Sequence, residues 1–366
     1  MQQDVKIIAD RLFALLRIAL LDSDNEFHHF ANIDNGEWEA LYNLALSQGV
    51  HAIAYDAMRK LPEEYQADID LKVQWAYNVN HAEERYKKQL AAAQIITNTF
   101  ARHSIQTMIM KGLSVAYFYP ISSHRQFGDI DIYLMGDFEQ GNRVVKEKGV
   151  KVKYDFFVHS EFAVKGVNIE NHLYFVNPKV NATGEYIQKT LLELSKTTIP
   201  HPTVSGAFMP SAEFNALFLI RHSSWHYARE CIRLRDICDW AMFLKANAEH
   251  LNTELVLKHL SASGLDRYAA ILTDIANRYL GLCQTLPFKE YDHALTDRVV
   301  EDILTFDNPE KHNDIGTLRT FFWKIRNRIG RKWCYDKVVP DSFWGNIAYS
   351  ITGYIKNPFA IFKAKL

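Results

Sequence analysis

Apolar residues recur at helical spacing through the first hundred positions of the chain. The repeat predicts four helices, over residues 5–21, 38–46, 51–58 and 70–103. Neither Gly nor Pro occurs in the fourth and longest segment, and its charged middle, HAEERYKKQL, indicates a solvent-facing side. We therefore expect a helical N-terminal region over residues 1–104.

After residue 104 the pattern changes to short apolar runs and alternation of apolar with polar residues. Such patterns are typical of β-strands, and they occur at residues 105–110, 129–134, 156–164 and 167–175. Lys165-Gly166, between the last two, has the composition of a hairpin turn. We expect an α/β core over residues 105–205, and we interpret its turn-rich last part, residues 177–205, as a linker.

Helical spacing returns at Ser211, whose hydroxyl suits the cap of a helix, and continues with breaks to about residue 305. Residues 317–337 then mix basic and aromatic side chains, and residues 342–362 are apolar and aromatic. We predict a helical C-terminal domain over residues 206–366. The basic segment would pack on this domain, and the apolar tail is a candidate docking segment for a partner. The whole chain is thus predicted to be an α+β protein.

Composition and charge exclude several classes of protein. The formal net charge is -1, so no overall basic field exists to attract nucleic acid or an anionic membrane. The four cysteines form no CxxC pair and suit reduced, buried thiols. The start of the chain lacks the features of a signal peptide, and no run of about 18 apolar residues occurs. We expect a cytoplasmic protein with no transmembrane segment and no strong nucleic-acid signal.

The strand predicted at residues 129–134 carries two carboxylates on one face. Side chains two positions apart on a strand point the same way, so Asp129 and Asp131 share a face while Ile130 and Ile132 pack into the core. Mg²⁺ prefers oxygen ligands and keeps positions open for phosphate oxygens. This pair is therefore predicted to bind a metal ion that assists phosphoryl-type transfer.

Four residues near this strand are candidates for contacts with phosphate. Gly112 lies at a predicted strand-to-helix turn, and a helix N-terminus favours phosphate. Lys111 and Ser114 flank it with an ammonium and a hydroxyl group. Arg125 lies in the loop before Asp129, where its guanidinium would clamp phosphate.

A third carboxylate is predicted on a neighbouring strand. Glu170 and His172 share a face of the alternating stretch VNIENHLYF. We assign Glu170 as a metal ligand or as the general base for an acceptor hydroxyl, and His172 as a residue that lines the site or pairs with Glu170.

These residues together resemble the bacterial "uncharacterised nucleotidyltransferase" family of the DNA polymerase β-like superfamily. The resemblance rests on Lys111-Gly112, on RQFGDIDI (125–132) and on Ile169-Glu170 with His172, and it extends to residues 38–58 and 217–244. It implies a small mixed sheet with helices, a magnesium (or Mn²⁺) site at Asp129, Asp131 and Glu170, and transfer of a nucleoside monophosphate from an NTP. No residue pattern indicates the acceptor.

Two other hypotheses stay open. Gly112 is followed by Leu113, so Ser114 comes one place later than in the wider superfamily, which suggests a degenerate core that binds nucleotide or a partner without turnover. His222 and His226 are one helical turn apart and with Asp239 would suit a metal hydrolase. Ser residues replace the glutamate of an HExxH motif, so we favour a pocket-lining role for the two histidines.

Overall fold

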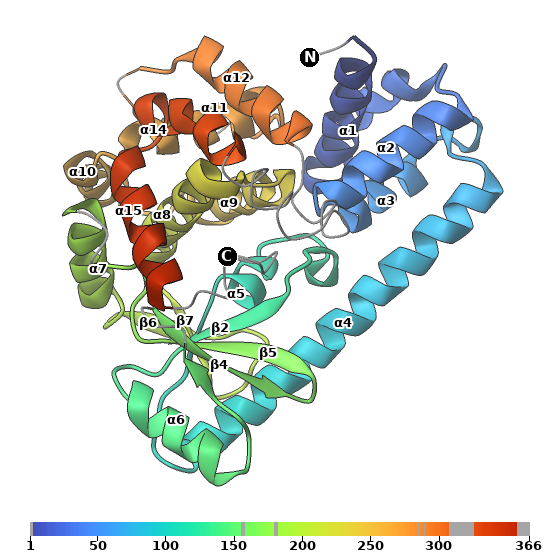
Figure 1. Ribbon diagram of the computed structural model, residues 1–366. Helices are drawn as coiled ribbons and strands as arrows, with labels where there is room; N and C mark the ends of the chain where they lie inside the picture. Colours follow the sequence, from blue (N-terminus) through green and yellow to red (C-terminus); the bar gives the residue numbers. More distant parts are fainter. Residues whose placement is uncertain are drawn as a thin grey trace.

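The computed structural model describes residues 3–154, 158–178, 182–283, 286–288, 290–306 and 326–356. Within these residues, one seven-stranded mixed sheet lies below a body of helices that comes from both ends of the chain (Figure 1). The predicted α+β class, with a small mixed sheet flanked by helical regions, is confirmed.

The N-terminal helices form where the apolar spacing predicts them. They are α1 (Gln3–Leu21), α2 (Asn35–Ser47), α3 (His51–Lys60) and α4 (Ile69–Ala101), with 3-10 turns η1 (Asp24–Phe30) and η2 (Glu63–Tyr65). Asp68 caps α4 by accepting a hydrogen bond from the Leu71 N–H. The 33 residues of α4 extend about 50 Å, from the N-terminal helices to the sheet (Figure 1). Trp75 near one end packs in the helical core, and Phe100 near the other packs against the sheet.

The sheet has the strand order β3-β4-β5-β2-β1-β7-β6. The strands are β1 (Met108–Met110), β2 (Asp129–Tyr133), β3 (Lys153–Tyr154), β4 (His159–Val164), β5 (Val167–His172), β6 (Thr198–Pro200) and β7 (Phe208–Pro210). Strand β2 pairs antiparallel with β1 and parallel with β5. The predicted hairpin joins β4 and β5, and its turn residues Lys165 and Gly166 have φ values of 51° and 80°, which suit a turn of type I′.

Three short helical segments belong to this sheet region. They are α5 (Gly112–Ala116), the 3-10 turn η3 (Ser122–His124) and α6 (Phe138–Glu147). Helix α5 follows β1 directly, as predicted, and contacts both β2 and α9. It therefore lies between the sheet and the C-terminal helices.

The prediction of a linker over residues 177–205 is wrong. This segment contains helix α7 (Ala182–Leu194) and strand β6, which forms a hairpin with β7 at the edge of the sheet. Pro200, one of the residues on which the linker prediction rested, lies in β6 at the sheet edge, where proline is tolerated although it is depleted from central strands. The sheet therefore extends five residues beyond the predicted end of the core at residue 205.

The C-terminal helices pack with those of the N-terminus in one core. They are α8 (Ala212–Glu230), α9 (Leu234–Asn247), α10 (Thr253–Ser263), α11 (Asp266–Arg278), α12 (His293–Thr305), α14 (Lys332–Lys337) and α15 (Phe343–Lys356). Ser211 caps α8 as predicted, through a hydrogen bond from the Phe214 N–H. Buried Trp38 of α2 and Trp240 of α9 belong to the same hydrophobic cluster. The two helical regions thus form a common body over the sheet.

The C-terminal tail is described only to Lys356. This part forms α15, in which the hydroxyl of Tyr349 accepts a hydrogen bond from Asn177 at 2.9 Å. The first part of the predicted basic aromatic segment, residues 317–325, and the end of the apolar tail, residues 357–362, lie outside the described residues. No helix in the described ranges is long and apolar enough to cross a membrane.

Candidate active site

Three carboxylates meet at the centre of the sheet. Strand register places Asp131 of β2 directly beside Glu170 of β5, with Asp129 one pleat away beside Asn168. Ile130 and the other alternate residues of β2 are buried in the core between the sheet and α4. The structure thus brings together the three acids that the sequence singles out as metal ligands.

Electrostatics separate the roles of the two aspartates. Burial, followed by repulsion from Asp131 and Glu170, raises the pKa of Asp129 to about 6. Burial also opposes ionisation of Asp131, but the Lys111 ammonium and the His172 imidazole outweigh it and hold the pKa of Asp131 well below its usual range. Asp131 is therefore a fully ionised, paired carboxylate, while Asp129 is a carboxylate that lacks sufficient positive charge nearby.

Lys111 is held in a strained turn and pairs with Asp131. Its Nζ lies 2.7 Å from Asp131 Oδ1, and its φ is 43°, between β1 and α5. A non-glycine residue in the left-handed region costs of order 1–3 kcal/mol. From this turn the Lys111 ammonium reaches the carboxylate cluster.

His172 supplies a second cation to Asp131. Its Nε2 lies 2.9 Å from Asp131 Oδ1, and its Nδ1 lies 3.1 Å from the carbonyl oxygen of Tyr174. Although burial opposes protonation, hydrogen bonds to Asp131 and Glu170 raise the pKa of His172 to about 9. At neutral pH the imidazole therefore carries a positive charge and donates from both nitrogens.

We expect the pairing of His172 to make stability depend on pH. Its pKa rises from 6.5 to about 9 on folding, so the stabilisation is complete below pH 6.5 and is lost as pH rises through about 9. The shift corresponds to at most about 3 kcal/mol. Urea unfolding in the presence of a chelator gives the free energy of unfolding of wild type and of His172→Gln at each pH in this range. The difference between the two free energies should be largest below pH 6.5 and should shrink as pH rises through about 9. Parallel stability curves for the two proteins would contradict the assignment.

A cavity of about 90 Å³ opens beside the carboxylates, between the sheet and helices α8 and α9. Seven residues singled out in the sequence line it: Lys111, Gly112, Arg125, Asp129, Asp131, His222 and Asp239. Five other polar or aromatic lining residues were not predicted: Phe127, Ser223, Arg235, Asp236 and Trp240. Small-molecule pockets usually enclose roughly 300–1,000 Å³, so a nucleotide would extend beyond this cavity or require it to widen.

The structure separates the residues that were predicted to bind phosphate. Ser114 is buried and donates its hydroxyl hydrogen to the Ile109 carbonyl at 2.6 Å, so its side chain does not line the cavity. Gly112 lines the cavity, and a Cβ there would lie 3.0 Å from the ring of Phe127. A side chain at this turn would therefore press against that ring.

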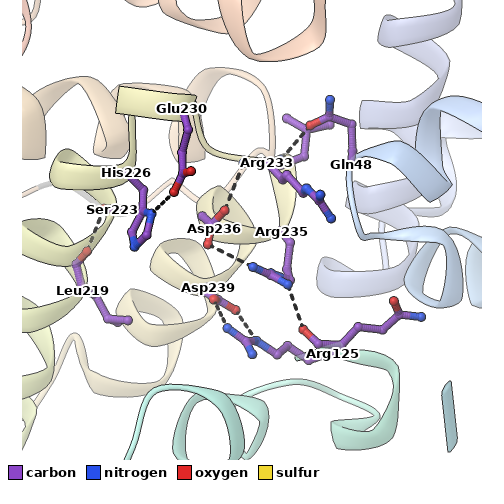
Figure 2. Close-up of polar contacts among 12 residues, drawn as sticks. Gln48, Arg125, Leu219, Ser223, His226, Glu230, Arg233, Arg235, Asp236 and Asp239 are labelled. Carbon is purple, nitrogen blue, oxygen red and sulfur yellow. Dashed lines mark hydrogen bonds and ion pairs between the residues drawn. The ribbon is translucent and has the colours of Figure 1, made fainter. Parts of the chain in front are cut away.

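Arg125 forms a buried ion pair with α9. Its Nε donates to Asp239 Oδ1 at 2.9 Å, its second terminal nitrogen contacts Oδ2, and the Tyr119 hydroxyl donates to Oδ1 at 2.7 Å. Figure 2 shows Arg125 and Arg235 facing the acidic side chains of α9. Arg235 donates to the Gln126 carbonyl at 3.3 Å and contacts Asp236 at 3.6 Å. Arg125 therefore holds the loop before β2 against the C-terminal helices.

The two histidines of α8 have different surroundings. His222 lines the cavity, and burial keeps its pKa well below the usual value, so the ring is neutral. His226 Nδ1 lies 2.5 Å from Glu230 Oε1 (Figure 2). Both oxygens of Asp239 contact Arg125, so this acid is already engaged. Among the described residues, the group of three His, Cys, Asp or Glu ligand atoms that lie within 4.8 Å of one another is His159, Glu170 and His172. It includes none of His222, His226 and Asp239, so the hydrolase hypothesis gains no support.

The mixed sheet carries an Asp-x-Asp pair beside a third carboxylate, next to a Gly-containing strand-to-helix turn, which is the arrangement that the resemblance of the sequence implies. The profile of the family described as "uncharacterised nucleotidyltransferase" matches residues 34–281, which is more than half of the chain. The chain belongs to this family.

No curated protein matches this chain. Among solved structures, it is similar to an antigenic nucleotidyltransferase-like protein from Paracoccidioides brasiliensis, with 13% sequence identity and a TM-score of 0.30. The similarity covers 48% of this chain and 90% of that one.

Proposed function

We propose that this protein transfers a nucleoside monophosphate from an NTP to an acceptor, with Mg²⁺ held by Asp129, Asp131 and Glu170. The observation that carries the proposal is the arrangement of these three carboxylates on adjacent strands, with Asp129 and Asp131 lining a cavity. Their oxygens suit the donor preference of Mg²⁺. The raised pKa of Asp129 supports the fit, because a divalent cation would relieve the repulsion that raises it.

The residues around the carboxylates would bind the phosphates of the NTP and accept the proton of the acceptor. A bound Mg²⁺ supplies charge neutralisation at the phosphates and polarises the phosphorus that is attacked. Lys111 and Arg235 present cations to the cavity, where phosphate oxygens would lie. In this proposal Glu170, whose pKa is lowered by the His172 hydrogen bond despite burial, stays ionised and would serve as a metal ligand or as the base that accepts the proton of an acceptor hydroxyl.

One contact favours a second candidate function, nucleotide binding without transfer. Lys111 Nζ and His172 Nε2 both lie within 3 Å of Asp131 Oδ1, so Asp131 has counter-ions without a metal. If these cations outcompete Mg²⁺, the cavity would bind phosphate through Lys111 and Arg235 without a metal ion, and no product would form.

Calorimetry with the four NTPs and Mg²⁺ tests the proposed function. We expect one NTP to bind wild type only when Mg²⁺ is present, and this binding to disappear in Asp129→Asn/Asp131→Asn. Glu147→Gln removes an exposed carboxylate of α6 in the same region and should bind as wild type does. Binding of no NTP, or equal binding by the double variant, would refute the proposed site.

A transfer assay separates the two candidates. An NTP labelled at the α-phosphate is incubated with the protein and with pools of hydroxyl-bearing small molecules and proteins. Label that moves to an acceptor in wild type but not in Asp129→Asn supports transfer. NTP binding that is independent of Mg²⁺ and yields no labelled product supports the binding function.

A further inference from the structure

A row of polar side chains crosses three adjacent strands on the face that carries Asp131. Strand β4 pairs with β5 so that His159 lies opposite His172, while Asp131 of β2 lies beside Glu170 on the other side of β5. On β4 the residue opposite Glu170 is Glu161, and the two imidazoles lie opposite each other two residues further along the strands. His159 Nε2 also lies 3.4 Å from Glu161 Oε1. His159 was not singled out in the sequence.

The atoms of this row are close enough to share an ion. His159 Nε2 lies 3.8 Å from Glu170 Oε1, and His172 Nε2 lies 3.7 Å from Glu170 Oε2. The three potential ligand atoms all lie within 4.8 Å of one another. Ligands at about 2.1 Å from a tetrahedral ion would be about 3.4 Å apart, so small side-chain rotations close the site.

The hydrogen bond behind His172 orients it as a ligand. A carbonyl oxygen only accepts, so His172 Nδ1 must carry the hydrogen that it donates to Tyr174. Its Nε2 then faces the carboxylates and donates to Asp131 in the metal-free protein. Binding of a metal ion at Nε2 would release this proton to solvent. Histidines that bind metals usually make this kind of bond to a carbonyl or carboxylate through the second ring nitrogen.

We propose that His159, Glu170 and His172 form a second metal site, which binds a first-row transition metal ion of the Zn²⁺ type. Two imidazole nitrogens and one carboxylate favour such an ion over Mg²⁺, which prefers oxygen ligands. The side chains of His159, Glu170 and His172 are 16%, 17% and 5% exposed, so an ion would be largely shielded yet reachable. Three protein ligands leave one position open for water or substrate.

The proposed site shares Glu170 with the proposed magnesium site, but it does not rest on nucleotide transfer. Asp129 belongs to the magnesium site alone, and His159 belongs to the second site alone. Variants of these two residues therefore test the two proposals separately.

Titration of the metal-free, untagged full chain with Zn²⁺ by calorimetry, and with Co²⁺ by visible absorption, tests the second site. We expect one tightly bound ion per chain, with affinity reduced about 100-fold or more in His159→Ala. Asp129→Asn should keep this binding. His226→Gln is the matched control, because it removes an imidazole that also lies beside a glutamate.

Several outcomes would overturn the proposal. In one, wild type binds no ion in the titration, and in another, His159→Ala binds the ion with the affinity of wild type. Loss of affinity in His226→Gln instead of His159→Ala would also contradict the proposal. Circular dichroism establishes that each variant is folded, and His159→Gln, which keeps a polar side chain of similar size, replaces His159→Ala if the latter unfolds.

Discussion

Replacing Asp129 with Asn should stabilise the metal-free protein and abolish metal-dependent transfer in the same variant. Burial and the charges of Asp131 and Glu170 raise the pKa of Asp129 to about 6, so its ionised form destabilises the fold. Because the pKa of Asp129 is higher in the folded state than in the unfolded state, the free energy of unfolding falls as pH rises from 3.8 to about 6. Above that range the full loss of stability remains. Asn removes the charge, and with it a cost of about 1–3 kcal/mol.

Urea unfolding of wild type and Asp129→Asn, with a chelator present, measures this effect. The variant should be more stable by about 1–3 kcal/mol near pH 7.5, and the difference should shrink toward zero near pH 4. Mg²⁺ should stabilise wild type and not the variant. Transfer should fall by about 10³-fold, since loss of a metal ligand removes several kcal/mol of charge stabilisation.

Asp131→Asn is the matched comparison, because it should lose the same activity with the opposite effect on stability. It removes the counter-ion of both Lys111 and His172. A buried charge left without its partner typically costs about 3–5 kcal/mol. If Asp129→Asn proved less stable than wild type near neutral pH, or if either variant retained turnover, the assigned roles would be wrong.

The sequence predicts most of the fold because its periodic patterns are long and locally consistent. Helix α4 has no breaking residue for over thirty positions, and its predicted start and end differ from the observed ones by no more than two residues. The pattern failed at residues 177–205, where β6 is three residues long and lies at the sheet edge. Such a strand has too few positions to show alternation, and its one proline, Pro200, indicates a loop unless the partner strand is known.

The carboxylate cluster could be predicted because strand alternation determines which side chains share a face. The same logic extends to His159, since a two-residue turn at Lys165-Gly166 pairs Val164 with Val167 and therefore His159 with His172. The sequence thus contained a signal for the second imidazole, in the register of the predicted hairpin. The direction of a hydroxyl at a short helix has no such signal, and Ser114 donates to the Ile109 carbonyl instead of reaching the cavity.

The partner of Arg125 could not be predicted, because 114 residues separate it from Asp239. Only the packing of α9 against α5 and the loop before β2 brings the two together. This tertiary contact also explains how the sheet and the C-terminal helices form one cavity, since the ion pair lies in its wall.

Removing one member of this pair should destabilise the protein strongly. In Asp239→Ala, the Arg125 guanidinium stays buried without its carboxylate, and the Tyr119 hydroxyl also loses its acceptor. Both side chains of the pair are at most 6% exposed. Breaking a buried pair on one side typically costs about 3–5 kcal/mol, so the free energy of unfolding should fall by that amount.

The surface pair of Arg278 and Asp297 provides the control. Its nitrogen–oxygen distance is 2.8 Å, but the two side chains are 37% and 50% exposed. Asp297→Ala should therefore cost no more than about 1 kcal/mol. Urea unfolding of Asp239→Ala and Asp297→Ala gives the free energy of unfolding that each variant loses. Equal losses would show that burial does not determine how much the Arg125 pair contributes to stability.

Replacing both members of the buried pair separates stability from function. Arg125→Met/Asp239→Leu leaves no uncompensated charge, so it should recover most of the stability that Asp239→Ala loses. Arg125 lines the cavity together with Asp129, and the double variant has no cation at position 125. If Arg125 only braces the loop, NTP binding should recover together with stability. If its charge also attracts phosphate, stability should recover while affinity for NTP stays about tenfold or more below that of wild type.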